Sequence, residues 1–280
     1  MVAPGTLYLV ATPIGNLEDI TYRAVRVLGE AGLIACEDTR QTSKLLARYA
    51  IDGPVISYHE HNEKTRTEEL LARLREGTSV ALVSDAGTPL VSDPGYRLVT
   101  RAVEEGIPVE PIPGPSAVLT ALIASGLPTD AFHFGGFLPA KSGQRRKALE
   151  QVKDLRATVV FYEAPHRILD TLADVETVLG HRSVVIAREL TKMHQEFLRG
   201  TAGELLHELE SRPAVKGEIT LLIAKSEEGE TVSEVPIPEA VERLIVEGMP
   251  KMDAIKTVAH LRGLSKRDVY RQVEDSSHKN

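Results

Sequence analysis

The sequence predicts an α/β protein with two α/β domains, mostly parallel sheets and a small C-terminal helical domain. Short apolar runs alternate with amphipathic stretches as far as about residue 225, which is the rhythm of strands connected by helices. The stretch 80–95, "VALVSDAGTPLVSDPG", passes from an apolar run into a loop rich in Gly and Pro. A buried parallel strand that ends in such a loop is typical of the ligand-binding edge of an α/β sheet.

The first series of elements predicts an N-terminal α/β domain over residues 1–112. Its helices show apolar positions at helical spacing, and one of them closes at Gly77, a residue type that commonly terminates helices. Strands are expected at 6–12, 33–37, 54–58, 78–84 and 107–112, and helices at 22–31, 39–49, 64–77 and 95–106.

A turn-rich segment, "PIPGPSA" at 111–117, separates this series from a second one, so a second α/β domain is expected at 113–226. Its first helix, 115–125, ends before Gly126 and Pro128. Further helices are expected at 142–155, 165–179 and 201–211, and strands at 131–137, 157–163, 183–189 and 218–225.

The remaining residues, 227–280, predict a linker and a helical tail. Residues 226–238 are rich in Glu and contain no basic residue, which indicates a linker. Helices are expected at 238–247, 250–262 and 265–274, with Val241, Leu244 and Ile245 packing on Ile255, Val258 and Leu261. The third helix would expose Lys266, Arg267 and Arg271, which could hold RNA phosphates; the alternative is that the tail is a dimer brace or a solvated cap.

The composition narrows the class of protein. The 280 residues are 42% hydrophobic and can bury a full core. No apolar run approaches the ~20 residues of a membrane helix, and the N-terminus lacks the pattern of a signal peptide. A cytoplasmic protein without a membrane partner is therefore expected. The single cysteine, Cys36, excludes an internal disulfide and a cysteine-built metal site.

The net charge of −7 argues against a broadly basic nucleic-acid-binding surface. The charge is unevenly distributed, because residues 137–156 carry six Lys and Arg against two acidic residues. Arg145 and Arg146 in this segment are candidates for phosphate binding; the alternative is an ordinary solvated helix start.

Common cofactor and metal motifs are missing. The first loop, "ATPIGNLED", has one glycine and does not match the dinucleotide pattern G-x-G-x-x-G. The P-loop pattern, the G-x-S-x-G elbow and a spaced His/Cys set for zinc are also absent. The sequence therefore predicts no metal site.

Polar clusters instead follow several predicted strands. They are "CEDTRQT" (36–42), "YHEHNE" (58–63), "SDAGTPLVSDPG" (84–95), "FYEAPHR" (161–167) and "RELTKMHQEFLRG" (188–200). The carboxyl ends of parallel strands share one edge of a sheet, so these clusters predict a ligand site there. Each cluster could also be a set of helix caps, since Asp38 or Thr39 could cap the helix that follows.

These and other segments resemble the tetrapyrrole-methylase superfamily and, more narrowly, its ribosomal branch, the small-subunit rRNA (cytidine-2′-O)-methyltransferases. The segments are "VATPIGNLEDIT", "CEDTR", "YHEHNE", "SDAGTPLVSDPG", "PGPSA", "FGGFLP", "FYEAPHRI", "RELTKMHQE" and "KGEITLLI". The resemblance covers about residues 5–225 in order, and 236–273 resemble that branch's helical tail. It implies two α/β domains around a cleft that holds S-adenosylmethionine, usually in a homodimer.

The resemblance also assigns residues. It places cofactor contacts at Pro13, Asp85, Ala86, Gly87, Val91, Ser116, Ala117, Tyr162, Leu190, Glu218, Ile219 and Thr220. It directs "CEDTR" and "YHEHNE" toward the nucleotide, with Glu37, Arg40, His61, Asn62 and Lys192 as substrate contacts beside Arg145 and Arg146. A ribose 2′-hydroxyl is a poor nucleophile, so a base near it helps, and Asp38, His59 and Glu60 are the candidates.

The expected function is 2′-O-methylation of a cytidine in 16S rRNA within the small ribosomal subunit. Two alternatives stay open. One is methylation of a small tetrapyrrole-like substrate on the same fold, and the other is a non-catalytic ribosome-binding module.

Overall fold

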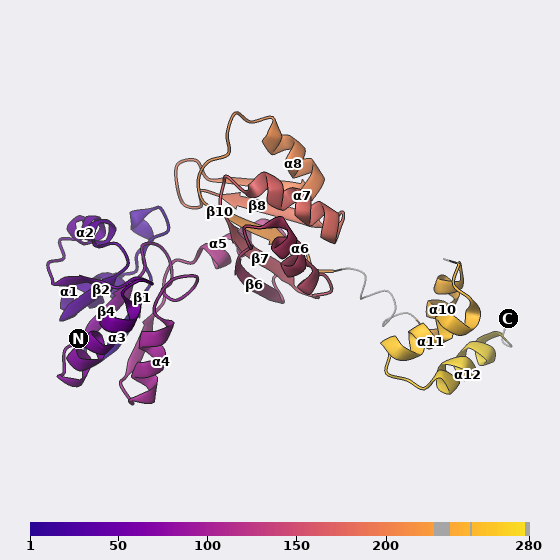
Figure 1. The fold of residues 1–280 in the computed structure, drawn as a ribbon, viewed down its shortest axis with the longest axis horizontal. Coiled ribbons are helices and arrows are strands. Elements are labelled where there is room, and N and C mark those ends of the chain that lie inside the picture. Colours follow the sequence, from indigo (N-terminus) through magenta and orange to yellow (C-terminus); the bar gives the residue numbers. More distant parts are fainter. Residues whose placement is uncertain (227–235, 247, 278–280) are drawn as a thin grey trace.

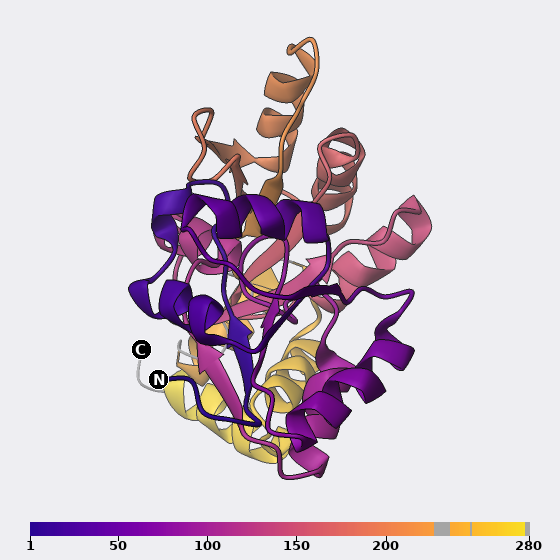
Figure 2. The same ribbon diagram turned by 90° about the vertical axis from the view of Figure 1, so that its left-hand side faces the viewer.

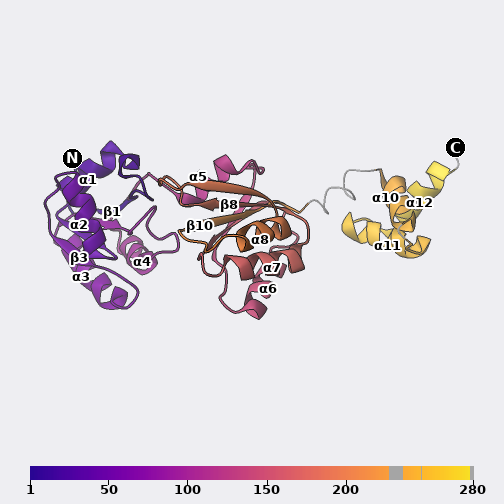
Figure 3. The same ribbon diagram turned by 90° about the horizontal axis from the view of Figure 1, so that it is seen from above.

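The described part of the chain forms two five-stranded sheets followed by a group of three helices (Figures 1 and 3). The structure is a computed structural model that describes residues 1–226, 236–246 and 248–277. Most of the predicted linker, 226–238, lies outside the described residues. Seen from the side of the first sheet, the indigo and purple elements of that sheet lie in front of the orange ones of the second (Figure 2).

The first sheet is entirely parallel, as predicted, with the strand order β3-β2-β4-β1-β5. Its five short strands are mostly apolar, and the three central ones are mostly buried on both faces. The five strands are β1 (Leu7–Val10), β2 (Leu33–Cys36), β3 (Val55–Ser57), β4 (Val80–Val83) and β5 (Val109–Ile112). All five carboxyl ends therefore lie at one edge of this sheet.

Four helices cover the first sheet, two on each face. α1 (Tyr22–Glu30) and α2 (Thr39–Arg48) pack in one apolar cluster with alternate strand residues such as Val10 and Val83. α3 (Glu63–Arg75) and α4 (Tyr96–Glu104) pack in another with Leu7 and Leu82. Successive strand side chains point to opposite faces, so the two clusters lie on opposite sides of the sheet.

The second sheet is mixed, which corrects the prediction of mostly parallel sheets. Its order is β6-β7-β10-β8-β9, and only the β6–β7 pair is parallel among its four pairings. The strands are β6 (Phe132–Phe137), β7 (Thr158–Glu163), β8 (Ser183–Arg188), β9 (Glu196–Thr201) and β10 (Ile219–Ile223). α5 (Ala117–Ser125) packs on one face, and α6 (Ser142–Gln151), α7 (Ile168–Leu179) and α8 (Ala202–Glu210) pack on the other.

β9 was not predicted, because its residues fall inside the polar segment 188–200. It is an edge strand whose side chains are half-buried or exposed, so it lacks the continuous apolar run of a buried strand. β10 runs antiparallel between β7 and β8, with Ile219 opposite both Glu163 and Arg188. The start of β10 therefore lies at the same edge as the ends of β7 and β8.

The three tail helices are α10 (Ile237–Val246), α11 (Lys251–Leu261) and α12 (Lys266–Ser277). Their shared core contains Val241, Ile255 and Val258 with Leu244 packed against it, as predicted. Ile245 and Leu261 were predicted wrongly, since they are 38% and 59% exposed.

The predicted domain boundaries at 112/113 and 226/227 stay predictions. None of the described helices is both long and apolar enough to cross a membrane.

Candidate active site

A cavity of about 400 Å³ lies where loops from the two sheets meet. The first sheet contributes the loops after β1 and β4, and the second contributes the end of β7 and the start of β10. The first residues of α5 complete the wall. The lining residues are Ile14, Asp85, Ala86, Gly87, Thr88, Val91, Ser92, Asp93, Ser116, Ala117, Phe137, Tyr162, Glu163, Ala164, Pro165, Glu218, Ile219 and Thr220.

A pair of backbone hydrogen bonds joins the loop after β4 to the loop after β1. The N–H of Thr12 donates to the carbonyl of Gly87 at 2.9 Å, and the N–H of Gly87 donates to the carbonyl of Thr12 at 3.0 Å. Gly87 has φ +85°, and Leu90 and Ser92 in the same loop have φ +71° and +66°. Residues other than glycine adopt this conformation at a cost, so the surrounding structure holds the loop in a strained form beside the cavity.

The amino end of α5 forms another part of the wall. Ser116 caps this helix, because its side chain accepts a hydrogen bond from the N–H of Leu119 at 3.5 Å. Thr88 donates to the carbonyl of Pro115 at 3.2 Å, which ties the loop after β4 to the start of α5. The first turn of a helix carries partial positive charge and suits a carboxylate.

Carboxylates dominate the electrostatics of the cavity. Four of its lining residues are acidic, and none of the described ones is Lys, Arg or His. Two carboxylates are neutralised from outside the cavity: Glu163 pairs with Arg167 at 2.6 Å, and Glu218 pairs with Lys192 at 2.9 Å. The other two, Asp85 and Asp93, form no ion pair within the described part of the chain.

Asp93 shows the consequence of this imbalance. Burial first, and then the nearby charges of Glu37 and Asp85, raise the pKa of Asp93 to about 6 against the lowering effect of a hydrogen bond from Ser84. Its charge in turn contributes, after burial, to the raised pKa of Tyr162 across the cavity. Uncompensated negative charge in a partly desolvated cavity favours a cationic ligand.

The predicted catalytic residues Asp38, His59 and Glu60 follow β2 and β3 at the same edge of the first sheet, but none of them lines the cavity. Asp38 caps α2 and accepts hydrogen bonds from the Arg40 guanidinium at 2.8 and 3.1 Å. These bonds hold the pKa of Asp38 at about 2. Asp38 is therefore a weak proton acceptor, and Arg40 is already engaged.

His59 and Asn62 form a fixed turn. Asn62 Oδ1 accepts from the N–H of His59 at 2.9 Å, and Asn62 Nδ2 donates to the carbonyl of Ser57 at 3.2 Å. The same Nδ2 lies 3.2 Å from His59 Nε2, while His59 Nδ1 is enclosed without a hydrogen-bond partner among the described atoms. Glu60 and His61 are exposed. Asn62 therefore shapes the loop, and the two exposed side chains remain free to meet a substrate.

Glu37 interacts both with the residues of the loop 58–63 and with the cavity wall. Its pKa is raised by burial first, then by the charges of Asp85 and Glu60. It also acts on Asp93 inside the cavity. Of the two acidic residues that follow β2, Glu37 has a raised pKa and Asp38 a lowered one, so Glu37 accepts a proton more readily.

Most of the predicted cofactor contacts line the cavity; Pro13 and Leu190 do not. Leu190 is 6% exposed and packs in the apolar core with Ile14, which reaches the cavity in place of Pro13. Sequence reasoning did not select Ile14, Thr88, Ser92, Asp93, Phe137, Glu163, Ala164 and Pro165. Each of them lies next to a predicted residue or within a quoted segment, Phe137 in "FGGFLP", and this is the signal that could have found them.

The predicted phosphate-binding cations are held in ion pairs. Lys192 donates to Glu189 at 2.8 Å and to Glu218 at 2.9 Å. Burial would lower the pKa of Lys192, but these bonds outweigh it and raise the pKa. Arg145 is 3% exposed and pairs with Asp174 at 2.7 Å, so its predicted contact with RNA is wrong. Arg146 pairs with the same carboxylate at 2.6 Å but is half exposed, and its role stays a prediction.

Arg145→Ala is expected to lower the free energy of unfolding by about 3 kcal/mol, because it breaks a buried ion pair. The loss stays at the low end of that class, since Asp174 keeps its bonds to Arg146 and Ser142. Urea unfolding measures it, with Arg146→Ala as the matched control at about 1 kcal/mol or less. If the two variants unfold at the same urea concentration, the structural role of Arg145 is contradicted.

Comparison with known proteins agrees with this architecture. The model of the family described as Tetrapyrrole (Corrin/Porphyrin) Methylases matches residues 6–206. The chain is 54% identical to the Ribosomal RNA small subunit methyltransferase I of Halalkalibacterium halodurans, over 95% of this chain and 93% of that protein. It is 49% identical to the protein of the same name from Micromonospora olivasterospora, over 96% and 86%.

A solved structure shows the same fold at low sequence identity. The uroporphyrin-III-C-methyltransferase of Thermus thermophilus has a TM-score of 0.56 and 23% identity, with 79% of this chain and 94% of that chain covered. The chain therefore belongs to the tetrapyrrole methylase family and, within it, groups with the ribosomal RNA small subunit methyltransferase I proteins.

Proposed function

We propose that this protein transfers the methyl group of S-adenosylmethionine to the ribose 2′-oxygen of a cytidine in the 16S rRNA of the small ribosomal subunit. The observation that carries the proposal is the cavity between the two sheets, which joins unpaired carboxylates to a cluster of polar side chains at one sheet edge. The names of the relatives, which cover 95% of this chain, support the class of substrate.

The cofactor occupies this cavity, between the α/β domains proposed at 1–112 and 113–226. S-adenosylmethionine carries a positive sulfonium and a positive ammonium group against one carboxylate, so its net charge is positive. Asp85 and Asp93 supply negative charge without a competing cation, and the capped amino end of α5 offers N–H groups to the carboxylate. Gly87 allows the ligand to approach the backbone.

When bound, the cofactor supplies an electrophilic methyl group. The chain's own residues must align the ribose oxygen with it and exclude water. They must also accept the proton of the 2′-hydroxyl. We assign this last role to Glu37, because burial and the charges of Asp85 at the cavity wall and Glu60 in the loop 58–63 raise its pKa. His59 and Glu60 remain the alternatives at the same edge.

S-adenosylmethionine should bind more tightly as the pH rises from 5 to 7. A cationic ligand favours the ionised form of Asp93, whose pKa is about 6 in the free protein. At pH 5 the proton must leave on binding, which should weaken affinity by about tenfold relative to pH 7. Glu37, Asp85, Ser84 and Tyr162 surround this carboxylate, so their responses are part of the measured change.

Isothermal titration across this pH range tests the expectation. Asp93→Asn should flatten the pH dependence and weaken S-adenosylmethionine more than S-adenosylhomocysteine, which lacks the sulfonium charge. Asp130→Asn removes the same charge from the loop before β6, at the other end of that strand pair, and serves as control. A pH dependence that is equally steep in Asp93→Asn and the wild type would rule out this role.

We further propose a cytoplasmic homodimer. Large apolar side chains remain exposed on α5 and on edge strand β6, namely Leu119, Ile123, Phe132 and Phe137. A second copy that covers them would remove apolar surface from water.

Two competing functions are distinguished by measurements of binding and turnover. A protein without affinity for S-adenosylmethionine would be a ribosome-binding module, and a protein that methylates a small macrocycle would be a tetrapyrrole methylase.

A further inference from the structure

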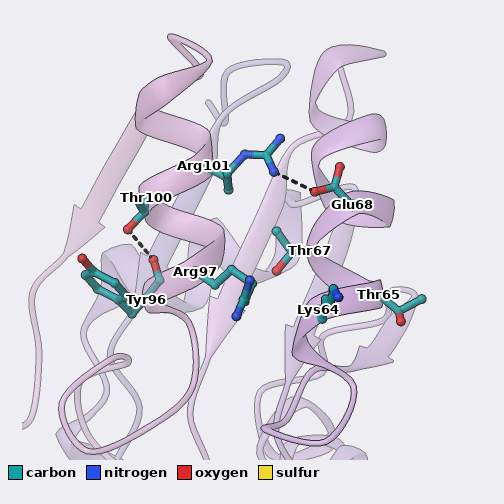
Figure 4. Close-up of a pocket in the computed structure, with 8 residues that line it drawn as sticks. All are labelled: Lys64, Thr65, Thr67, Glu68, Tyr96, Arg97, Thr100 and Arg101. Atoms are coloured by element: carbon teal, nitrogen blue, oxygen red, sulfur yellow. Dashed lines mark hydrogen bonds and ion pairs between the residues drawn. The ribbon is translucent and has the colours of Figure 1, made fainter.

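A groove of about 780 Å³ between α3 and α4 lies outside the proposed cofactor cavity (Figure 4). Its walls are formed by polar side chains of the two helices. They are Lys64, Thr65, Thr67 and Glu68 on α3, and Tyr96, Arg97, Thr100 and Arg101 on α4. The groove shares no lining residue with the cavity.

One end of the groove is closed by ion pairs between the helices. Arg101 pairs with Glu68 at 2.9 Å, and Arg75 pairs with Glu105 at 2.7 Å. These contacts pair Arg75 in the last turn of α3 and Arg101 in the last turn of α4. Figure 4 shows the first of them bridging the two helices.

The other end is open and carries two cations, while Glu68, the one acidic residue among the described residues that line the groove, belongs to the closed end. Lys64 and Arg97 lie in the first turns of the facing helices and are exposed. Neither forms an ion pair within the part of the chain that the structure describes. In Figure 4 the Arg97 side chain extends into the space between the helices, opposite Lys64. Like charges placed across a groove repel each other unless an anion lies between them.

This open end lies next to the proposed active site. Glu63 Oε1 accepts a hydrogen bond from the N–H of Gly95 at 3.3 Å, which ties the start of α3 to the start of α4. Asp93, two residues before Gly95, lines the cavity, and His59 and Glu60 precede α3 by a few residues. The amino ends of both helices add partial positive charge here.

We propose that the open end of this groove binds backbone phosphates of the rRNA strand next to the target nucleotide. The proposal rests on the proposed function. Lys192 and Arg145 are held by carboxylates, whereas Lys64 and Arg97 are available for phosphates. The hydroxyl of Thr65 lies on the same wall and can donate to a phosphate oxygen.

The test compares two double variants of the full-length protein. Lys64→Ala/Arg97→Ala removes the two groove cations, and Lys44→Ala/Arg48→Ala removes two exposed cations from α2 on the opposite face of the sheet. Affinity for purified small ribosomal subunits is measured at several salt concentrations, and S-adenosylmethionine affinity is measured by titration calorimetry. Lys64 and Arg97 form no ion pair within the described part of the chain, and Lys44 loses a single exposed hydrogen bond to Gln41 Oε1, so both double variants should fold.

The groove variant should bind the subunit about tenfold or more weakly and lose about one unit of salt slope for each phosphate contact removed. Its S-adenosylmethionine affinity should equal that of the wild type, and the α2 variant should behave as wild type throughout. Equal subunit affinity and salt slope in the groove variant and the wild type would overturn the proposal. If the groove variant binds the subunit like the wild type and the wild type methylates rRNA, the proposed function still holds. If the wild type methylates no rRNA, the proposed function itself is refuted.

Discussion

Gly87→Val is expected to weaken S-adenosylmethionine binding by at least ~100-fold, or about 2.7 kcal/mol. A Cβ at this position would meet Ile14 Cγ2 at 3.4 Å, which is ordinary contact, so the first carbon fits. The two further methyl groups of valine would occupy space at the cavity wall. Gly87 also has φ +85°, a conformation that a β-branched residue rarely adopts, so the loop pinned to Thr12 would shift.

Gly106→Val is the matched control for this variant. Gly106 has φ +69° and no atom within 4 Å of an added Cβ, and it follows α4 at the edge of the sheet away from the cavity. It should therefore carry a similar backbone strain, of order 1–3 kcal/mol in unfolding free energy, without touching the ligand. Calorimetric titration and urea unfolding of both variants separate the two effects. Wild-type affinity in Gly87→Val would exclude the cofactor from this loop.

Glu37→Gln is expected to reduce turnover by ~10²-fold or more, the usual contribution of a general base. The amide keeps the shape of the side chain but cannot accept the proton of the 2′-hydroxyl. S-adenosylmethionine affinity should stay near that of the wild type, because Glu37 does not line the cavity. Turnover of the wild type should fall as the pH drops through the raised pKa of Glu37, and this acid limb should disappear in the variant.

Three companion variants decide whether the assignment is right. Asp38→Asn keeps a side-chain oxygen that caps α2, because Asn caps helices as well as Asp does, and it loses only the charged contact with Arg40, so stability and turnover should both change little. His59→Ala and Glu60→Gln should raise KM if they only contact the nucleotide. Normal turnover of Glu37→Gln together with a large loss in His59→Ala or Glu60→Gln would move the base to that residue. Normal turnover of all four would make both clusters structural caps.

The first sheet could be predicted from the sequence for a physical reason, and so could the edge of it that carries the proposed site. The central strands β1, β2 and β4 are short apolar runs that are mostly buried, and helix α3 ends at a clear stop, Gly77. Parallel strands also place all their carboxyl ends together. The cluster at 84–95 could therefore be assigned to a ligand edge without knowing the strand order.

The second sheet was less predictable, because a buried strand has the same apolar sequence pattern whether it pairs in parallel or antiparallel. The direction of β10 follows from how the chain returns between β7 and β8, a tertiary choice that local pattern does not encode. β9 was hidden because an edge strand needs little apolar character. The antiparallel return of β10 explains why residues at the start of a strand, Glu218 to Thr220, line the cavity.

Ion pairing was the least predictable feature of the site. Arg145, Arg146 and Lys192 appear in sequence as free cations, but their partners Asp174, Glu189 and Glu218 lie on other elements or across a turn. Lys64 and Arg97 have no such partner among the described residues and were not selected from sequence. Burial of Asp93 and Glu37 was likewise set by packing between loops.

The central claim is most directly tested by mapping methylation on the substrate. Small ribosomal subunits from a strain that lacks this gene are incubated with the purified protein and S-adenosylmethionine carrying a deuterated methyl group, and the 16S rRNA is digested for mass spectrometry. We expect one labelled methyl group on the ribose of a single cytidine, and none when Gly87→Val replaces the wild type. Label on a base, or no label in the rRNA despite cofactor binding, would contradict the account.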